Sequence, residues 1–223
     1  MAKQNLEEIF QKKKRRLLGE IIKEVELKSA KAWVSIHGSS QEYLLTYESE
    51  GLVVSINGSG TIKADHPQAQ DAARITEYVV ANGGIVMNGG RKSGIMEASS
   101  KIGKENSLGI VFPELEKEIS KYGPRVVVNA PTPRIELLAT CAPIIVIFRG
   151  GLGTLMMLMR AITHINNRKY HPEQLPQLVF ISNYWIGLLQ TLMNMETLPR
   201  EFLAELEFFS SADEIIKKIS KIS

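Results

Sequence analysis

The stretch PIIVIFRGGLGTLMMLM, residues 143–159, decides the fold class. It opens with a continuous run of Ile, Val and Phe, which is typical of a strand buried on both faces. A glycine-rich segment, 150–154, ends that run, and the apolar residues after it recur at helical spacing. The stretch therefore predicts a strand, a tight glycine loop and a helix in direct succession.

The same rhythm repeats from Leu52 to the last residues of the sequence. The expected strands are 52–57, 83–88, 107–112, 125–130, 143–148 and 177–182. The expected helices are 66–83, 94–103, 132–141 and 154–167, with a terminal amphipathic helix at 211–222. This alternation predicts an α/β fold: a doubly wound, Rossmann-like parallel sheet with helices on both faces. Ligands of such sheets bind where strand ends meet the following helices, and three of these junctions are rich in glycine, at Gly58, 89–94 and 150–154.

Residues 1–50 do not share this rhythm, so we expect an N-terminal extension before a main domain at 51–223. Residues 3–29 are predicted to form one charged helix with a narrow apolar stripe of Leu18, Ile21, Ile22 and Val25. Its basic run QKKKRR is interpreted as a solvated helix face. Residues 31–50 are predicted to form two short strands around a Gly-Ser turn.

The composition indicates an ordinary globular protein, with 44% apolar and 23% charged residues and a net charge of +3. That charge is far from what a dedicated nucleic-acid binder carries, so we do not expect a nucleic-acid partner. A membrane partner is not expected either, because no segment has about 18 uninterrupted apolar residues. The lone Cys141 cannot form an internal disulfide, and the first residues lack the apolar core of a signal peptide. A cytoplasmic location is therefore expected.

The glycine segment after the strand at 143–148 can hold a phosphate. Gly150, Gly151 and Gly153 let the backbone approach a ligand closely, and Thr154 can cap the helix or donate its hydroxyl. Free N–H groups and the helix dipole then favour an anion. A plain tight turn is the alternative, and the glycines alone do not exclude it.

Other chemistries are not supported. The segment GGRKSG, 89–94, lacks the spacing of a P-loop, and GLGTLM, 151–156, has Met156 where a dinucleotide-binding motif needs its last glycine. The four histidines are scattered without ligand spacing, so no metal site is predicted. No cofactor is predicted, and Cys141 is expected to pack in a helix.

Four motifs, in order over the chain from about Leu52, resemble the LOG (Lonely Guy) family, long mislabelled as lysine decarboxylases. GSG followed by DHPQAQDAARI resembles the family's first strand, loop and helix, and GGRKSGIMEA resembles its GGGPGIMEA loop. PRIELLATCAPIIVIFRGGLGT resembles its stretch from an arginine to PGGxGT. LPQLVFISNYWIGLLQTLM resembles the strand and YW-containing helix that follow.

The resemblance implies a Rossmann-like homodimer or larger homo-oligomer that binds a phosphorylated nucleotide. The family's best-known activity is phosphoribohydrolysis, in which a nucleoside 5′-monophosphate is cut to a free base and ribose 5-phosphate. Relatives also include non-hydrolytic binders such as molybdenum-cofactor carrier proteins. By position in the motifs, Arg134 matches the catalytic arginine. The residues expected to bind nucleotide or phosphate are Gly58, Ser59, Gly89, Gly90, Gly94, Met96, Glu97, Arg149, Gly150, Gly151, Gly153 and Thr154.

The departures from the family pattern bear on catalysis. In PGGxGTxxE the proline is Arg149 here and the glutamate is Met157, while Arg91, Lys92 and Ser93 replace glycines and a proline in the second loop. Cleaving a glycosidic bond builds positive charge on the ribose, which a carboxylate can stabilise and a thioether cannot. Losing a general acid or base costs roughly 10²–10⁴ in rate. Glu97 and Glu136 are the candidate replacements.

Three hypotheses follow. The first is a nucleotide-binding protein with lost or altered hydrolase activity, favoured because an acid is lost and a cation gained in one loop. The second is a working phosphoribohydrolase with its acid rebuilt from elsewhere, and the third is a structural homo-oligomer with an empty site. The sequence favours them in that order.

Overall fold

The computed structural model describes residues 21–26, 30–37, 42–49, 51–167, 170 and 177–222. Two sheets form within these ranges. The larger has seven strands, all parallel, in the order β10-β9-β8-β4-β5-β6-β7, and the smaller has three antiparallel strands in the order β1-β2-β3. The parallel sheet confirms the doubly wound α/β fold.

The elements follow one another as the alternating pattern predicts. The strands are β1 (Ile21–Glu26), β2 (Ala30–His37), β3 (Glu42–Ser49), β4 (Val53–Asn57), β5 (Ile85–Asn88), β6 (Ser107–Val111), β7 (Arg125–Val127), β8 (Ile144–Ile147), β9 (Leu178–Ser182) and β10 (Leu206–Phe209). The α-helices are α2 (Pro67–Ala81), α3 (Gly94–Gly103), α4 (Pro131–Thr140), α5 (Leu152–Asn167), α6 (Ile186–Asn194) and α7 (Ala212–Ile219). Short 3-10 helices are η1 (Lys104–Asn106), η2 (Pro113–Glu118), η3 (Asn183–Trp185) and η4 (Arg200–Glu205).

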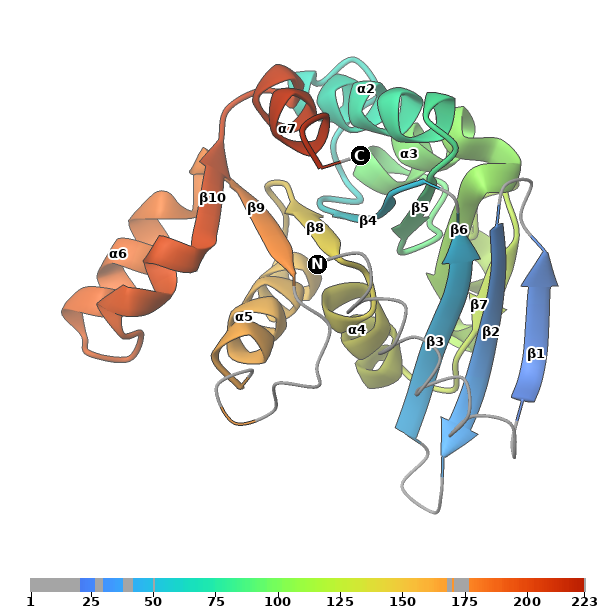
Figure 1. Cartoon of the computed structure of the whole chain (residues 1–223), viewed down its shortest axis with the longest axis horizontal. Coiled ribbons are helices and arrows are strands. Elements are labelled where there is room, and N and C mark those ends of the chain that lie inside the picture. Colours follow the sequence, from blue (N-terminus) through green and yellow to red (C-terminus); the bar gives the residue numbers. More distant parts are fainter. Residues whose placement is uncertain are drawn as a thin grey trace.

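Helices cover both faces of the parallel sheet, as Figure 1 shows, with α2, α3 and α7 on one side and α4 and α5 on the other. Alternate residues of each strand point to opposite faces. In β4, Val54 and Ile56 join a buried cluster with α2 and α7, whereas Val53 joins a second cluster with α4 and α5. The apolar runs in the sequence are continuous because β4, β5, β8 and β9 each contribute side chains to the buried clusters on both faces of the sheet.

The N-terminal sheet corrects one prediction. Residues 21–26 form β1 and pair with β2 in antiparallel register, with Val25 opposite Ala32, where a helix over 3–29 was expected. Ile21, Ile22 and Val25 are β-branched and suit a strand, so pairing with β2 overrides the helical spacing. Residues 3–20 and 27–29 of the expected helix lie outside the described residues. The two strands expected within 31–50 are confirmed as β2 and β3.

β3 brings the small sheet against the main domain. It packs on α4, where Tyr47 is buried in the same cluster as Leu137 and Leu138. Burial raises the pKa of Tyr47, and the charge of Cys141 acts in the same direction.

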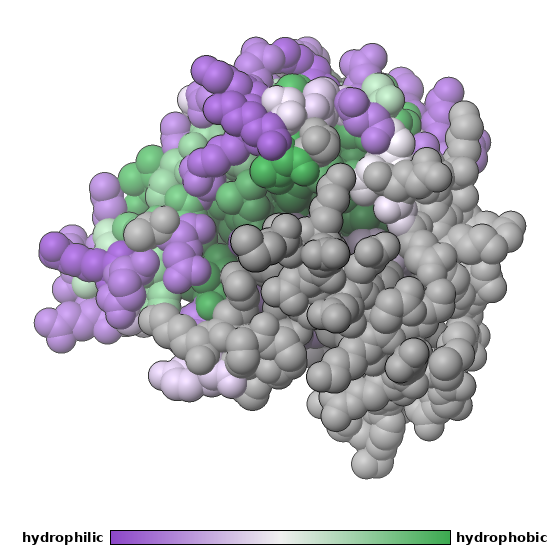
Figure 2. Space-filling model, viewed as in Figure 1, coloured by the Kyte–Doolittle hydropathy of each residue, from purple (hydrophilic) through white to green (hydrophobic). Residues whose placement is uncertain are grey.

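The surface is mostly polar where helices cover the sheet. In Figure 2 hydrophilic side chains gather along α7 and α2 at the top of the view, and apolar ones show between α7 and α6.

One strand, β10, was not expected from the sequence. It is four residues long and pairs in parallel with β9, and so short a run carries little periodic signal.

Candidate functional site

The glycine loops meet at the carboxyl edge of the parallel sheet. β4 and β8 are neighbours although the chain visits β5, β6 and β7 between them, so the strand order reverses at this pair. Such a reversal leaves a crevice at the carboxyl ends of the two strands, where ligands of open α/β sheets bind. The loops after β4, β5 and β8 all start at this edge. They are the three loops that the sequence singles out.

Backbone hydrogen bonds through Ser59 join these loops. Its N–H donates to the carbonyl of Arg149 at 2.8 Å, which ties the loop after β4 to the loop after β8. Its carbonyl accepts from the N–H of Ile95 at 2.9 Å, which ties it to the first turn of α3. The structure therefore brings the predicted residues of the first and third loops side by side, with α3 against them.

Two glycines of the second loop are required by close approach. Gly94 has φ +60°, and a Cβ there would lie 2.0 Å from the carbonyl oxygen of Ser59. A Cβ on Gly89 would lie 1.9 Å from Nη2 of Arg134. A side chain at position 94 would push the first and second loops apart, and one at position 89 would displace the guanidinium of Arg134 and the sulfur of Met96.

Arg134, on α4, lies against the second loop and the end of β6 and is only 9% exposed. Its Nε donates to the carbonyl of Ile110 and its Nη2 to the carbonyl of Gly89, both at 2.8 Å. Burial lowers the pKa of Arg134 to about 10, with a smaller contribution from the charge of Arg91, so the guanidinium is protonated at neutral pH. Within the described part of the chain no carboxylate pairs with it, and Nη1 has no hydrogen-bond partner. The guanidinium also lies 5.8 Å from the ring centre of Phe112. A buried cation whose partners carry no negative charge attracts an anion.

The second loop surrounds this cation with mixed partners. Met96 is buried, with its sulfur 3.7 Å from Nη2 of Arg134. Arg91 forms an ion pair with Glu118, and its Nε is buried without a partner among the described residues. Lys92 is exposed. The added charge of Arg91 therefore acts near Arg134, whereas Lys92 faces solvent.

The third loop leads directly into the first turn of α5. α5 begins at Leu152, two residues before the predicted start, and the N–H of Leu155 bonds back to Gly151 at 3.0 Å. Gly151 and Gly153 are exposed with open space around them, and Thr154 is buried against Gly150. The first N–H groups of a helix have no partner within the helix. These groups are available to a ligand beside the exposed glycines.

Arg149 is exposed at the rim of this loop. Its backbone N–H donates to Oε1 of Gln68 at 2.9 Å, and its guanidinium lies 5.2 Å from the ring centre of Tyr184. The cation–π contact directs the side chain toward η3. The structure thus places the gained cation beside the loop, and stacked on an aromatic ring.

Met157, which the resemblance matches to the LOG family's glutamate, is buried in the core. It is 5% exposed and belongs to the apolar cluster of α4 and α5 that contains Leu138, Leu158 and Ala161. The neighbouring Met156 is 53% exposed. The position at which the PGGxGTxxE motif has its glutamate is therefore occupied by an apolar side chain within an apolar cluster.

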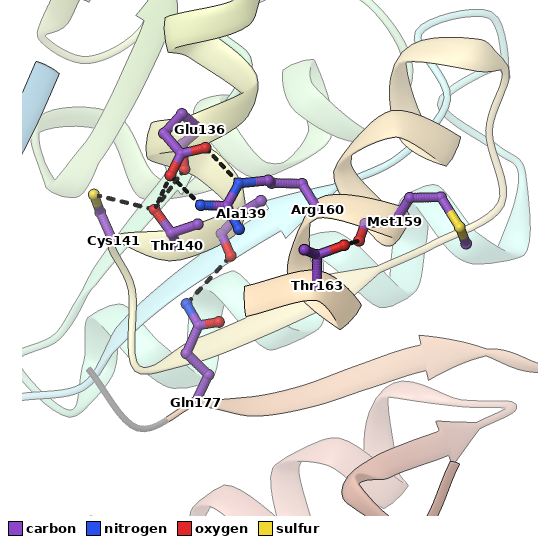
Figure 3. A network of polar contacts seen from close by, with 8 residues as sticks. All are labelled: Glu136, Ala139, Thr140, Cys141, Met159, Arg160, Thr163 and Gln177. Atoms are coloured by element: carbon purple, nitrogen blue, oxygen red, sulfur yellow. Dashed lines mark hydrogen bonds and ion pairs between the residues drawn. The ribbon is translucent and has the colours of Figure 1, made fainter. Parts of the chain in front are cut away.

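The two candidate replacement acids differ in their surroundings. Glu136 accepts two hydrogen bonds of 2.5 Å from Nε and Nη2 of Arg160 on α5, and Thr140 contacts the same carboxylate (Figure 3). Glu136 is therefore bound within the α4–α5 packing. Glu97, in the first turn of α3, is half-buried, and its Oε2 is buried without a partner among the described residues. Only Glu97 keeps a carboxylate oxygen uncommitted.

One polar residue at this edge was missed by the sequence reasoning. Asn57 ends β4, is 1% exposed, and its Oδ1 has no hydrogen-bond partner in the described part of the chain. Asn88 ends β5 in the same way and is fully bonded. The signal was present, because VSIN and IVMN both end an apolar strand with asparagine.

Among the described residues no group of three or more His, Cys, Asp or Glu side chains is arranged to hold a metal ion. Within the same ranges no helix has both the length and the apolar character needed to span a membrane.

Comparisons with known proteins agree with this architecture. The model of the SLOG cluster4 family matches residues 51–168. The chain is similar to the solved structure of a molybdenum cofactor binding protein from Rippkaea orientalis, at 17% identity and a TM-score of 0.59 over 78% of this chain and 98% of that one. It is similar to the molybdenum cofactor carrier protein of Chlamydomonas reinhardtii, at 16% identity and a TM-score of 0.55 over 77% and 98%. At these identities the two structures establish the fold alone. No curated protein matches the chain.

Proposed function

The chain belongs to the SLOG cluster4 family, and from this premise we propose that it binds a phosphorylated nucleotide or nucleotide-like ligand without cleaving it efficiently. The family and the fold support a ligand-binding protein related to the LOG proteins. The phosphorylated ligand and the loss of hydrolysis are our inference from the residues at the carboxyl edge. The ligand lies in the crevice between β4 and β8.

The observation that carries this proposal is the buried charge of Arg134. The guanidinium is bonded to two carbonyl oxygens and keeps Nη1 free of partners among the described residues. A buried cation without a counter-charge costs free energy that an anionic ligand recovers. Arg91 lies close enough to lower the pKa of Arg134, but its own charge is paired with Glu118. The site is therefore built for a ligand with negative charge.

The N-terminus of α5 supplies the second half of the anion site. Gly151 and Gly153 leave its first turn open, and the N–H groups there suit phosphate oxygens. Arg149 lies at the rim of the same loop. One ligand would place its phosphate at the N-terminus of α5 and contact Arg134 across the crevice.

The loss of hydrolysis follows from Met157. A buried thioether cannot stabilise the positive charge that develops on the ribose or orient an attacking water. Glu136 cannot substitute while Arg160 binds both of its oxygens. The solved neighbours are described as molybdenum cofactor binding and carrier proteins, which supports a binding role for this fold.

The test combines binding with turnover. Isothermal calorimetry with AMP and other nucleoside monophosphates is expected to show binding, and chromatography is expected to show no free base at enzymatic rates. Base release by the natural protein would overturn the loss of hydrolysis. Absence of binding by every phosphorylated ligand would overturn the proposal as a whole and favour a structural homo-oligomer.

A pair of neighbouring variants tests the motif position. We expect Met157→Glu to gain some base release, because it restores the acid at the family position. Met156→Glu is the matched control, since Met156 is the adjacent residue of α5 but is exposed, and it should gain nothing. Equal activity in the two variants would contradict the role assigned to position 157.

A second candidate function, an active phosphoribohydrolase, is favoured by one observation. Glu97 keeps a buried carboxylate oxygen without a partner in the described residues, at the edge where the glycosidic bond would lie. If the natural protein releases base, Glu97→Gln should abolish the release while leaving nucleotide binding in place. Unchanged release in Glu97→Gln would exclude Glu97 as the acid.

Two further expectations belong to this proposal. Leu152 and Met156 are 79% and 53% exposed and lie one turn apart on α5, which supports a homo-oligomer formed at this apolar surface. Light scattering of the natural protein and of Leu152→Glu checks this, with a smaller species expected for the variant. A cytoplasmic location is supported by the lone Cys141, which forms no disulfide.

A further inference from the structure

We infer that Asn57 is a ligand-binding residue that accepts a hydrogen bond from a sugar hydroxyl close to the bound phosphate. The inference rests on the proposed function, since it assumes a phosphorylated ligand in the crevice between β4 and β8. It assigns to the site a second kind of contact. The phosphate meets donors, and Asn57 offers an acceptor.

The orientation of the Asn57 amide is fixed by its neighbours. The hydroxyl of Ser55 donates to the carbonyl of Leu138 at 2.7 Å, which uses its only proton. Ser55 can therefore only accept from Asn57, so the group 3.0 Å from its oxygen is Nδ2. Oδ1 is the atom left without a partner. The free group is an acceptor and does not suit a phosphate.

The free oxygen faces the carboxyl edge. Asn57 and Ser55 lie two residues apart on β4, so both side chains lie on the same face of the sheet, the one covered by α4 and α5. Because Nδ2 is directed back along the strand to Ser55, Oδ1 is directed away from Ser55. Gly58 follows immediately, and the backbone of Asn57 bonds to Phe148 at the end of β8. The unpartnered oxygen thus lies at the reversal of strand order.

The nature of the donor follows from this position. A buried acceptor without a partner costs free energy, and a ligand N–H or O–H that reaches it recovers that cost. Asn57 is one residue from the loop that Ser59 bonds to Arg149, beside the first turn of α5. A ligand donor that reaches Oδ1 of Asn57 while the phosphate lies at α5 must therefore be only a few bonds from that phosphate. In a nucleotide the sugar hydroxyls meet this condition, whereas the base is farther away.

Gln177 provides a matched control within the chain. Its Oε1 is also buried without a partner among the described residues. Its Nε2 donates to the carbonyls of Ala139 and Ala142, and it lies at the amino end of β9, on the opposite edge of the sheet (Figure 3 shows the bond to Ala139). Ligands of this fold do not bind at that edge. The two residues share an unpartnered amide oxygen and differ in their position relative to the site.

The experiment measures the affinities of ribose 5-phosphate, 2-deoxyribose 5-phosphate and inorganic phosphate by calorimetry. For the natural protein we expect ribose 5-phosphate to bind most tightly. Asn57→Leu should weaken ribose 5-phosphate about fivefold, the usual value of one neutral hydrogen bond, and leave inorganic phosphate unchanged. Gln177→Met should change neither affinity. Asn57→Ala removes the same oxygen with less bulk, and thermal unfolding checks that each variant is folded.

The outcomes separate this inference from the function on which it rests. Equal affinities of Asn57→Leu, Asn57→Ala and the natural protein for ribose 5-phosphate would mean that only water meets Oδ1, and would overturn the inference alone. A loss seen with nucleotides and absent with ribose 5-phosphate would assign the donor to the base and overturn it too. If neither phosphate nor any phosphorylated ligand binds the natural protein, the proposed function itself fails.

Discussion

The carboxyl ends of β4 and β5 carry the same residue in opposite states. Asn88, at the end of β5, donates to the hydroxyls of Ser100 and Ser107 and accepts from the N–H of Gly90 at 2.7 Å. Asn57, at the end of β4, makes one side-chain hydrogen bond and leaves Oδ1 buried and unpartnered among the described residues. Both side chains are buried, at 0% and 1% exposure.

This difference separates an end of the sheet with a structural role from the end at which we propose that the ligand binds. Every polar atom of Asn88 is used to hold β5, β6 and α3 together, so the end of β5 is complete without a ligand. The end of β4 lies at the reversal of strand order, and Oδ1 of Asn57 there has no partner among the described residues. Native cores leave few buried polar atoms unpartnered, and those they leave are often functional.

The largest expected effect comes from Asn88→Leu. The change leaves the N–H of Gly90 and the serine hydroxyls without their partner, and each buried polar group left in this way costs about 1–3 kcal/mol. We expect the free energy of unfolding to fall by about 4 kcal/mol in urea denaturation. Asn57→Leu should change it by less than about 1 kcal/mol, because Ser55 still donates to Leu138. Similar losses in both variants would remove the distinction between the two ends.

Gly94→Ala is expected to destabilise by about 3 kcal/mol, because a Cβ there meets the carbonyl of Ser59 and the backbone is left-handed. Gly83→Ala is the matched variant, since Gly83 has φ +72° with no atom within 4 Å of its Cβ. It should cost about 1 kcal/mol from backbone strain alone. Denaturation of both variants measures the steric part, and equal losses would contradict the close approach of the two loops.

Arg134→Met should weaken AMP binding about 30-fold, or about 2 kcal/mol, as expected for a lost hydrogen bond to a charged group. Arg125→Met is the control, because Arg125 is an exposed arginine at the start of β7. Calorimetry should show unchanged affinity for the control. A weakened control would indicate that the affinity depends on overall charge, and Arg134 would lose its assigned place in the site.

The smallest effect is expected for Glu136→Gln. The Glu136–Arg160 pair is 30–41% exposed, and such pairs contribute about 0.5 kcal/mol. We expect urea denaturation to show a loss of this size and calorimetry to show unchanged AMP affinity. A large loss of AMP affinity would move Glu136 from the helix packing into the site.

Much of the fold could be predicted from periodicity. The runs that became β4 to β9 were visible because a strand covered on both faces is apolar throughout. β1 was not, since its Ile and Val residues fit helical and strand spacing equally until pairing with β2 decides. For the site, the glycines and Arg134 were accessible from their motifs. Asn57 was not, because its importance depends on which of its atoms find partners.

The sequence by itself determined a parallel α/β sheet and the position of its glycine loops, and through the family resemblance it indicated that Met157 stands where an acid is usual. These are properties of local pattern and residue chemistry, which the order of the chain carries directly. Only the tertiary structure decided that β4 lies beside β8, that Arg134 is buried among carbonyl oxygens, and that Glu136 is bound to Arg160. Each depends on segments far apart in the chain. The partners that folding brings to a side chain decide whether it is free to bind a ligand or is held in the packing of the fold.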